Sequence, residues 1–88
     1  NIPRAIPDGL CAKIEKAAIR TPGIFDLLQR MGDIPEHDMF NTYNMGVGMT
    51  MVVSRDTADA AVAALKAGGC DAYAVGEIVS GEEKVTLC

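Results

Sequence analysis

The strongest periodic pattern in the sequence is an alternation of side chains that runs from Met45 to Val53. One face of an extended chain there carries the apolar residues Met45, Val47, Met49, Met51 and Val53. The other face carries Gly46, Gly48, Thr50, Val52 and Ser54. Because successive side chains of a strand point to opposite faces, this pattern predicts a β-strand with one apolar face.

Three further strands are predicted on weaker patterns. Partial alternation between Leu10 and Ala18 favours a strand, although Ala, Lys and Glu also suit a helix. The ranges 72–79 and 85–88 are expected to form two strands joined by a turn at Gly81-Glu82-Glu83. The opening residues 1–9 contain two prolines and a glycine, which predicts an extended connection that ends in a turn.

Two helices are predicted in the first half of the chain. The first begins with Thr21 as N-cap and Pro22 at the first helical position, and Gly32 ends it. Its apolar face consists of Ile24, Leu27, Leu28 and Met31. A short second helix spans residues 35–41, with Met39 and Phe40 facing inward.

A third helix is predicted after the alternating segment. Asp56 and Asp59 resemble a capping box at its start, and Gly68-Gly69 ends it. Its apolar stripe is Ala58, Ala61, Val62 and Leu65. The order of elements predicts an α+β fold, in which helices lie on one face of a mostly antiparallel sheet.

Size and charge exclude several classes of protein. A chain of 88 residues is one small domain or part of one. The 49% hydrophobic content is too high for a disordered tail, and no apolar run approaches the ~20 residues of a membrane span. The net charge is −4 and the Lys and Arg residues are scattered, so we expect no nucleic-acid partner.

The three cysteines indicate a reducing compartment. Cys11, Cys70 and Cys88 are odd in number, widely spaced and without a CxxC pair. This arrangement fits neither a disulfide framework nor a zinc site. With no recognisable signal peptide or lipidation motif, the expectation is reduced thiols in the cytoplasm.

Few residues suggest catalysis by themselves. His37 lies between Glu36 and Asp38, but adjacent residues do not converge on one ion, so a solvated helix start is the preferred interpretation over a metal site. Gly46-Val47-Gly48 begins a dinucleotide fingerprint that fails at Met51. Glycines in a strand also indicate close approach of a ligand or of another element, and the residues leave both open.

Three stretches resemble the phosphoribosylformylglycinamidine cyclo-ligase family, whose members are also called aminoimidazole ribonucleotide synthetases. Residues 1–4, Asn-Ile-Pro-Arg, resemble a segment that follows a glycine run in that family. Residues 38–49, Asp-Met-Phe-Asn-Thr-Tyr-Asn-Met-Gly-Val-Gly-Met, resemble its acidic-Met-x-x-Thr-Phe-Asn-x-Gly-x-Gly-Met motif. Residues 74–78, Ala-Val-Gly-Glu-Ile, resemble its Ile-Gly-Glu-Val run, and the resemblance covers essentially the whole chain.

The resemblance implies an enzyme larger than this chain. Residues 1–88 would be the last part of the C-terminal domain, itself a larger two-layer structure, without the N-terminal ATP-binding domain. The family enzyme is a homodimer that uses ATP with Mg²⁺ to cyclise formylglycinamidine ribonucleotide to 5-aminoimidazole ribonucleotide, with ADP and phosphate as the other products. The 88 residues alone are expected to be inactive.

The resemblance also implies ligand contacts but assigns no catalytic acid or base. Asn1 and Arg4 would bind the ribose phosphate of the substrate or order the preceding loop. Asn44 would hydrogen-bond the amide that is activated, and the backbone amides of Gly46 and Gly48 would approach a phosphate. The full set of candidates is Asn1, Arg4, Thr42, Asn44, Gly46 and Gly48. A fold-holding role is the alternative for each.

Two other classes remain open. One is a related ATP-dependent enzyme: selenophosphate synthetase, thiamine-monophosphate kinase, a hydrogenase maturation factor, or formylglycinamidine ribonucleotide synthetase. The other is a stand-alone module that binds a small ligand or drives oligomerisation.

Overall fold

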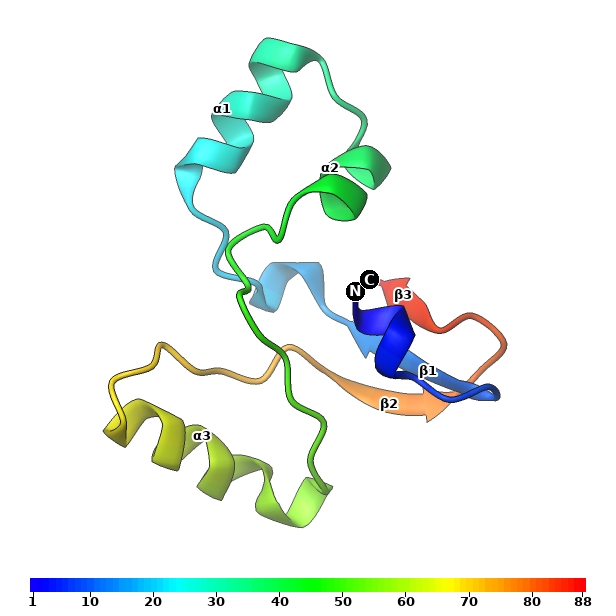
Figure 1. Cartoon of the computed structure of the whole chain (residues 1–88), viewed down its shortest axis with the longest axis vertical. Helices are drawn as coiled ribbons and strands as arrows, with labels where there is room; N and C mark the ends of the chain where they lie inside the picture. The colour runs from blue at the N-terminus through cyan, green and yellow to red at the C-terminus, as the bar shows by residue number, and fades with distance from the viewer. The chain divides into compact units, whose positions relative to one another are not determined.

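The chain divides into two units, each of which is described by itself. A computed structural model describes residues 1–88 (Figure 1). The sheet unit consists of Asn1–Ala18 and Met51–Cys88, and the helical unit consists of Ile19–Thr50. The α+β class predicted from the order of elements is confirmed.

The sheet unit is built on three strands with β1 (Leu10–Ile14) at the centre. β2 (Gly76–Ser80) pairs antiparallel with β1, so that Leu10 lies opposite Ser80. β3 (Val85–Leu87) pairs parallel with the other edge of β1, with Ala12 opposite Val85. The sheet is therefore mixed, where mostly antiparallel pairing was expected.

The mixed pairing follows from the link between β2 and β3. A tight hairpin would have placed β3 beside β2. Instead the chain crosses the start of β1, where the Gly81 amide donates to the Gly9 carbonyl at 3.1 Å. The link still reverses the chain direction. Since β2 runs opposite to β1, a strand that reverses again on the far side of β1 must run parallel to it.

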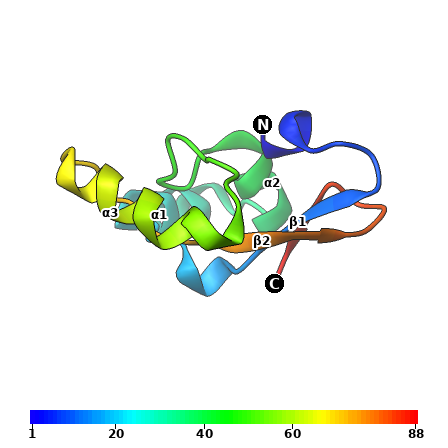
Figure 2. The same ribbon diagram turned by 90° about the horizontal axis from the view of Figure 1, so that it is seen from below.

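The N-terminal part of the sheet unit differs from the expectation in two places. Residues expected to be extended form a short 3₁₀ turn, η1 (Ile2–Ala5), which lies over one face of the sheet (Figure 2). β1 stops at Ile14 because a second 3₁₀ turn, η2 (Lys16–Ala18), follows. The good helix formers after Ile14 thus adopt a helical turn, the alternative that their propensities favoured.

The third helix, α3 (Ala58–Ala67), follows a 3₁₀ turn, η3 (Arg55–Thr57), and packs chiefly against that turn. Its four predicted stripe residues are its only half-buried positions. The predicted capping box of Asp56 and Asp59 is absent, since the helix start has no side-chain cap. Instead, the Thr57 hydroxyl donates to the Ser54 carbonyl at 3.0 Å. Gly68 and Gly69 end the helix as predicted.

The helical unit contains α1 (Gly23–Gly32) and α2 (Glu36–Thr42). Pro22, and not Thr21, occupies the N-cap position of α1, and no side chain caps the helix. Gly32 is the last helical residue, and the left-handed C-cap is Asp33 at φ 49°. In α2, Met39 is fully buried and Phe40 half-buried.

The alternating segment from Met45 to Val53 does not form the predicted strand. Met45 and Gly46 have φ values of 55° and 96°, and the Val47 amide donates to the Asn44 carbonyl at 2.9 Å. Positive φ at both central residues is the pattern of a type I′ turn. A chain that turns at residues 45–46 cannot be extended there, and the residues that follow join no sheet.

The buried apolar side chains form a short list. The sheet unit contributes Ile6, Cys11, Ala12 and Ile14, and the helical unit contributes Met39 and Met45. Of the methionines on the apolar face predicted for the alternating segment, Met45 is buried, whereas Met49 and Met51 are exposed. None of the helices combines the length and the apolar character that a membrane span requires.

Candidate functional site

The end of α2 and the loop after it hold four of the six candidate residues. Thr42 is the last residue of α2, and the Tyr43 amide closes the helix by donating to the Met39 carbonyl at 2.9 Å. The Tyr43 ring lies 5.9 Å from the ring of Phe25 on α1, tilted by 60°. This aromatic contact holds the start of the loop against α1.

Asn44 shapes the turn that follows. Its Oδ1 atom accepts a hydrogen bond from the Gly46 amide at 2.9 Å, while its carbonyl accepts from the Val47 amide. An Asn side chain that bonds to the backbone two residues on stabilises such a turn locally. The Asn44 side chain is exposed, so its Nδ2 group is the part of the residue suited to contact a ligand.

Gly46 and Gly48 occupy different surroundings. A Cβ atom on Gly46 would lie 2.5 Å from Pro22 Cδ and 3.1 Å from the Arg20 carbonyl oxygen. Gly46 is therefore needed for close approach of another part of the chain, one of the two alternatives that the sequence left open. A Cβ atom on Gly48 would have no atom within 4 Å, so its backbone is accessible.

Asn1 and Arg4 belong to the other unit. Both are exposed, and the Arg4 amide donates to the Asn1 carbonyl at 3.1 Å within the η1 turn. Pro3 occupies the first turn of η1, where its missing N–H costs no hydrogen bond. The six candidates are thus divided, with two in the sheet unit and four in the helical unit.

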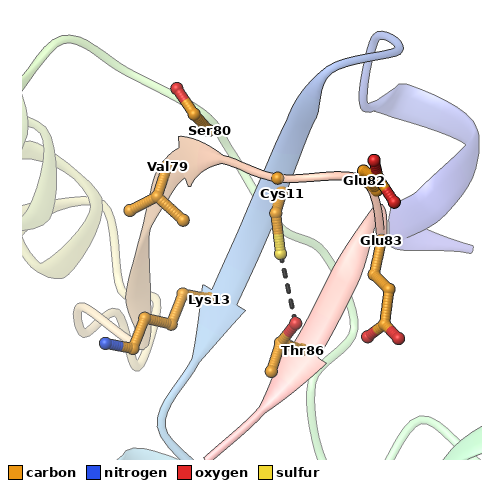
Figure 3. A pocket seen from close by; sticks show the side chains of 8 residues that line it. Cys11, Lys13, Val79, Ser80, Glu82, Glu83 and Thr86 are labelled. Atoms are coloured by element: carbon orange, nitrogen blue, oxygen red, sulfur yellow. Dashed lines mark hydrogen bonds between the residues drawn. The ribbon is translucent and has the colours of Figure 1, made fainter.

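A hollow of about 410 Å³ in the sheet unit includes none of the six candidates. Figure 3 shows its lining, in which Cys11 Sγ lies 3.2 Å from Thr86 Oγ1. Lys13 supplies an ammonium group on the same face of β1, and Glu82 and Glu83 supply carboxylates from the link to β3. Period-two spacing in the strand predicted from Leu10 already placed Cys11 and Lys13 on one face. Only the pairing of β3 brought Thr86 to them.

His37 lies in the first turn of α2 and is exposed. The side-chain amide nitrogen of Asn41, one helical turn later, lies 2.9 Å from His37 Nε2. This contact on the helix surface agrees with the interpretation of a solvated helix start. In the structure, no group of three or more His, Cys, Asp or Glu side chains is arranged to hold a metal ion.

A mixed three-stranded sheet, with three α-helices between its first and second strands in the sequence, defines an α+β fold. The turn at residues 44–47, with Gly48 directly after it, contains or adjoins three of the candidate residues, Asn44, Gly46 and Gly48. The chain belongs to the family described as AIR synthase related protein, C-terminal domain, whose model matches residues 1–88.

Individual relatives agree with this assignment. The phosphoribosylformylglycinamidine cyclo-ligase of Lachnospira eligens is 44% identical over 88 residues, and that of Lachnoclostridium phytofermentans is 47% identical over 88 residues. The match includes 100% of the chain but 26% of each relative. The protein of the same name from Staphylococcus saprophyticus is 42% identical over 87 residues, which are 99% of the chain and 25% of the relative. The chain therefore spans about a quarter of the length of these relatives.

Proposed function

We propose that the chain is the last part of a phosphoribosylformylglycinamidine cyclo-ligase. This enzyme would use ATP to cyclise formylglycinamidine ribonucleotide to 5-aminoimidazole ribonucleotide, giving ADP and phosphate. One observation carries the proposal: relatives with this printed name match 100% of the chain at 44% and 47% identity. In the reaction, ATP activates the formyl amide oxygen as a phosphate ester, and the amidine nitrogen then attacks that carbon and expels phosphate.

The candidate residues would contribute hydrogen-bond donors and one positive charge. Arg4 would hold the ribose phosphate through its guanidinium, which suits bidentate phosphate contacts, with Asn1 beside it in the η1 turn. Asn44 would contact the reacting amide through Nδ2, since its Oδ1 atom is engaged by Gly46. Thr42 would add a hydroxyl from the end of α2.

Of the two glycines, Gly48 is the better candidate for contact with a nucleotide phosphate. The Gly46 amide already donates within the turn, whereas the backbone at Gly48 is open. Gly48 is therefore the position at which a phosphate of ATP would be approached, and bound ATP with Mg²⁺ would supply the phosphoryl group. Most nucleotide contacts would come from the remainder of the protein, which would work as a cytoplasmic homodimer.

The test uses the complete parent protein that contains these 88 residues. We expect ADP, phosphate and aminoimidazole ribonucleotide to form only when formylglycinamidine ribonucleotide, ATP and Mg²⁺ are all present. The purified 88-residue chain should form no product. A parent protein that is folded but shows no ATP-dependent ring closure would contradict the proposal, and product formation by the 88 residues alone would contradict their dependence on the remainder.

Asn44→Asp separates a ligand contact from a structural role. An aspartate keeps the oxygen that accepts from Gly46 and removes the Nδ2 donor. We expect kcat/KM to fall about 10- to 100-fold, the loss typical of a hydrogen bond worth about 1.5–3 kcal/mol. The melting temperature should stay close to that of the natural parent protein. Unchanged kcat/KM in Asn44→Asp would show that Asn44 only holds the turn.

A further inference from the structure

The turn at residues 44–47 is held against the first turn of α1 at two points. Before the turn, the Tyr43 ring lies 5.9 Å from the Phe25 ring and is tilted by 60°, a geometry in which aromatic rings attract each other. Within the turn, Gly46 approaches Pro22 so closely that a Cβ atom would lie 2.5 Å from Pro22 Cδ. Pro22 is the N-cap of α1, and the Phe25 amide donates to its carbonyl at 3.2 Å. One helical turn therefore makes both contacts.

The backbone of this turn needs support from its surroundings. Met45 has a φ of 55°, a left-handed conformation that a residue with a Cβ atom rarely adopts. Such a residue keeps this conformation where the surrounding structure holds it. The Met45 side chain is buried, and the contacts of Tyr43 and Gly46 flank it. The turn is thus fixed by packing as well as by its own hydrogen bonds.

The candidate side chain that the turn displays is directed by the backbone beneath it. Asn44 is exposed, and its Oδ1 atom accepts from the Gly46 amide at 2.9 Å. The direction of the Asn44 Nδ2 group therefore follows the backbone of the turn. A displacement of about 1 Å at a reacting group can cost about 100-fold in rate. The groups that fix this backbone thus bear on any contact that Asn44 makes with a ligand.

We propose that Phe25 is a positioning residue, whose ring acts through Tyr43 to direct the Asn44 Nδ2 group toward the reacting amide. Tyr43 directly precedes Asn44 in the chain, so movement of its backbone is passed to Asn44 at once. The rings of Phe25 and Tyr43 are each half-buried, so their contact contributes less to stability than a contact in the core would. The inference rests on the contact proposed above for Asn44, and it adds a supporting residue outside the six candidates.

A double-mutant cycle in the complete parent protein tests this role. We expect Phe25→Leu to lower kcat/KM about 10-fold, because leucine keeps an apolar group but removes the ring contact. In the Asn44→Asp background, where the Nδ2 donor is already absent, the same substitution should lower kcat/KM by less than about 2-fold. Equal losses in both backgrounds would indicate a general structural role and would overturn the inference. Unchanged kcat/KM in Phe25→Leu would overturn it as well.

Substitutions of Tyr43 repeat the test from the other ring. Tyr43→Leu should show the same loss, again dependent on the background, and Tyr43→Phe, which keeps the ring, should recover most of the activity. The cycle also separates this inference from the proposed function. Ring closure by the natural parent protein with no effect of Asn44→Asp would leave the reaction in place and overturn the role of Phe25. Failure of ring closure by the natural parent protein would overturn the proposed function, and the inference with it.

Hydrogen exchange gives a readout that does not depend on the reaction. The Gly46 amide donates to Asn44 Oδ1, so its exchange rate reports how firmly the turn is held. It should exchange about 5-fold faster in Phe25→Leu than in the natural parent protein. The Gly69 amide, which donates to the Lys66 carbonyl at 3.0 Å after α3, should keep its rate. Unchanged exchange at Gly46, or equal acceleration at both amides, would overturn the positioning role.

Discussion

Gly46 illustrates how one residue is constrained twice by its surroundings. Its φ of 96° lies in the left-handed region, and the space where a Cβ would project is taken by Pro22. Gly48, two residues later, has neither a positive φ nor a neighbour within 4 Å. The two glycines of this motif thus serve different purposes, one in packing and one in leaving the backbone open.

This difference predicts unequal effects of alanine at the two positions. Gly46→Ala should lower the free energy of unfolding of the parent protein by about 1–3 kcal/mol, because the left-handed backbone and the Pro22 contact both resist a Cβ. Gly48→Ala should change it by less than about 0.5 kcal/mol. Urea unfolding of both variants measures the gap. A cost at Gly46 no larger than at Gly48 would show that the turn is not held as described.

At the scale of elements, the pairing of β1 with β2 depends on a glycine at its end. Gly76 lies opposite Ile14, and a Cβ there would overlap the carbonyl oxygen of Lys13. We expect Gly76→Ala to destabilise the parent protein by about 2 kcal/mol or more, since the two strands must separate. Gly23→Ala, at the open first position of α1, should instead stabilise it by about 0.5 kcal/mol. Denaturant titrations of both variants check these opposite signs.

The local pattern of α3 predicts its structure more reliably than the alternation at residues 45–53 predicts a strand. The stripe from Ala58 to Leu65 and the end of α3 at Gly68 follow from spacing, which is a local property. The predicted capping box at Asp56 and Asp59 is wrong because the chain makes an additional 3₁₀ turn from Ser54 before α3 begins. No local pattern in the sequence identifies β3 as the parallel partner of β1. This pairing depends on the link after β2 crossing the start of β1.

At the scale of the whole chain, more large apolar side chains are exposed than are buried. Six apolar residues are buried, whereas nine large ones are exposed, among them Ile24, Leu27 and Met31 on the face of α1. Both β2 and β3 are edge strands. Exposed apolar side chains and open edges recruit further polypeptide.

The isolated 88-residue chain is therefore expected to associate in solution. Light scattering under reducing conditions should show dimers or larger species that increase with concentration. The reducing agent is needed because Cys70 and Cys88 are exposed thiols that would otherwise form intermolecular disulfides. A monomer that persists at high concentration would contradict this expectation.

The sequence by itself determined the class of fold, the half-buried stripe of α3 and the family. These depend on spacing along the chain, which a sequence displays directly. The tertiary structure decided the parallel pairing of β3, the packing role of Gly46 and the hollow beside Cys11. It also left Met49–Val53 outside the sheet, despite the clearest alternation in the chain. A strand needs a partner for its backbone and cover for its apolar face, and both are set by residues distant in sequence.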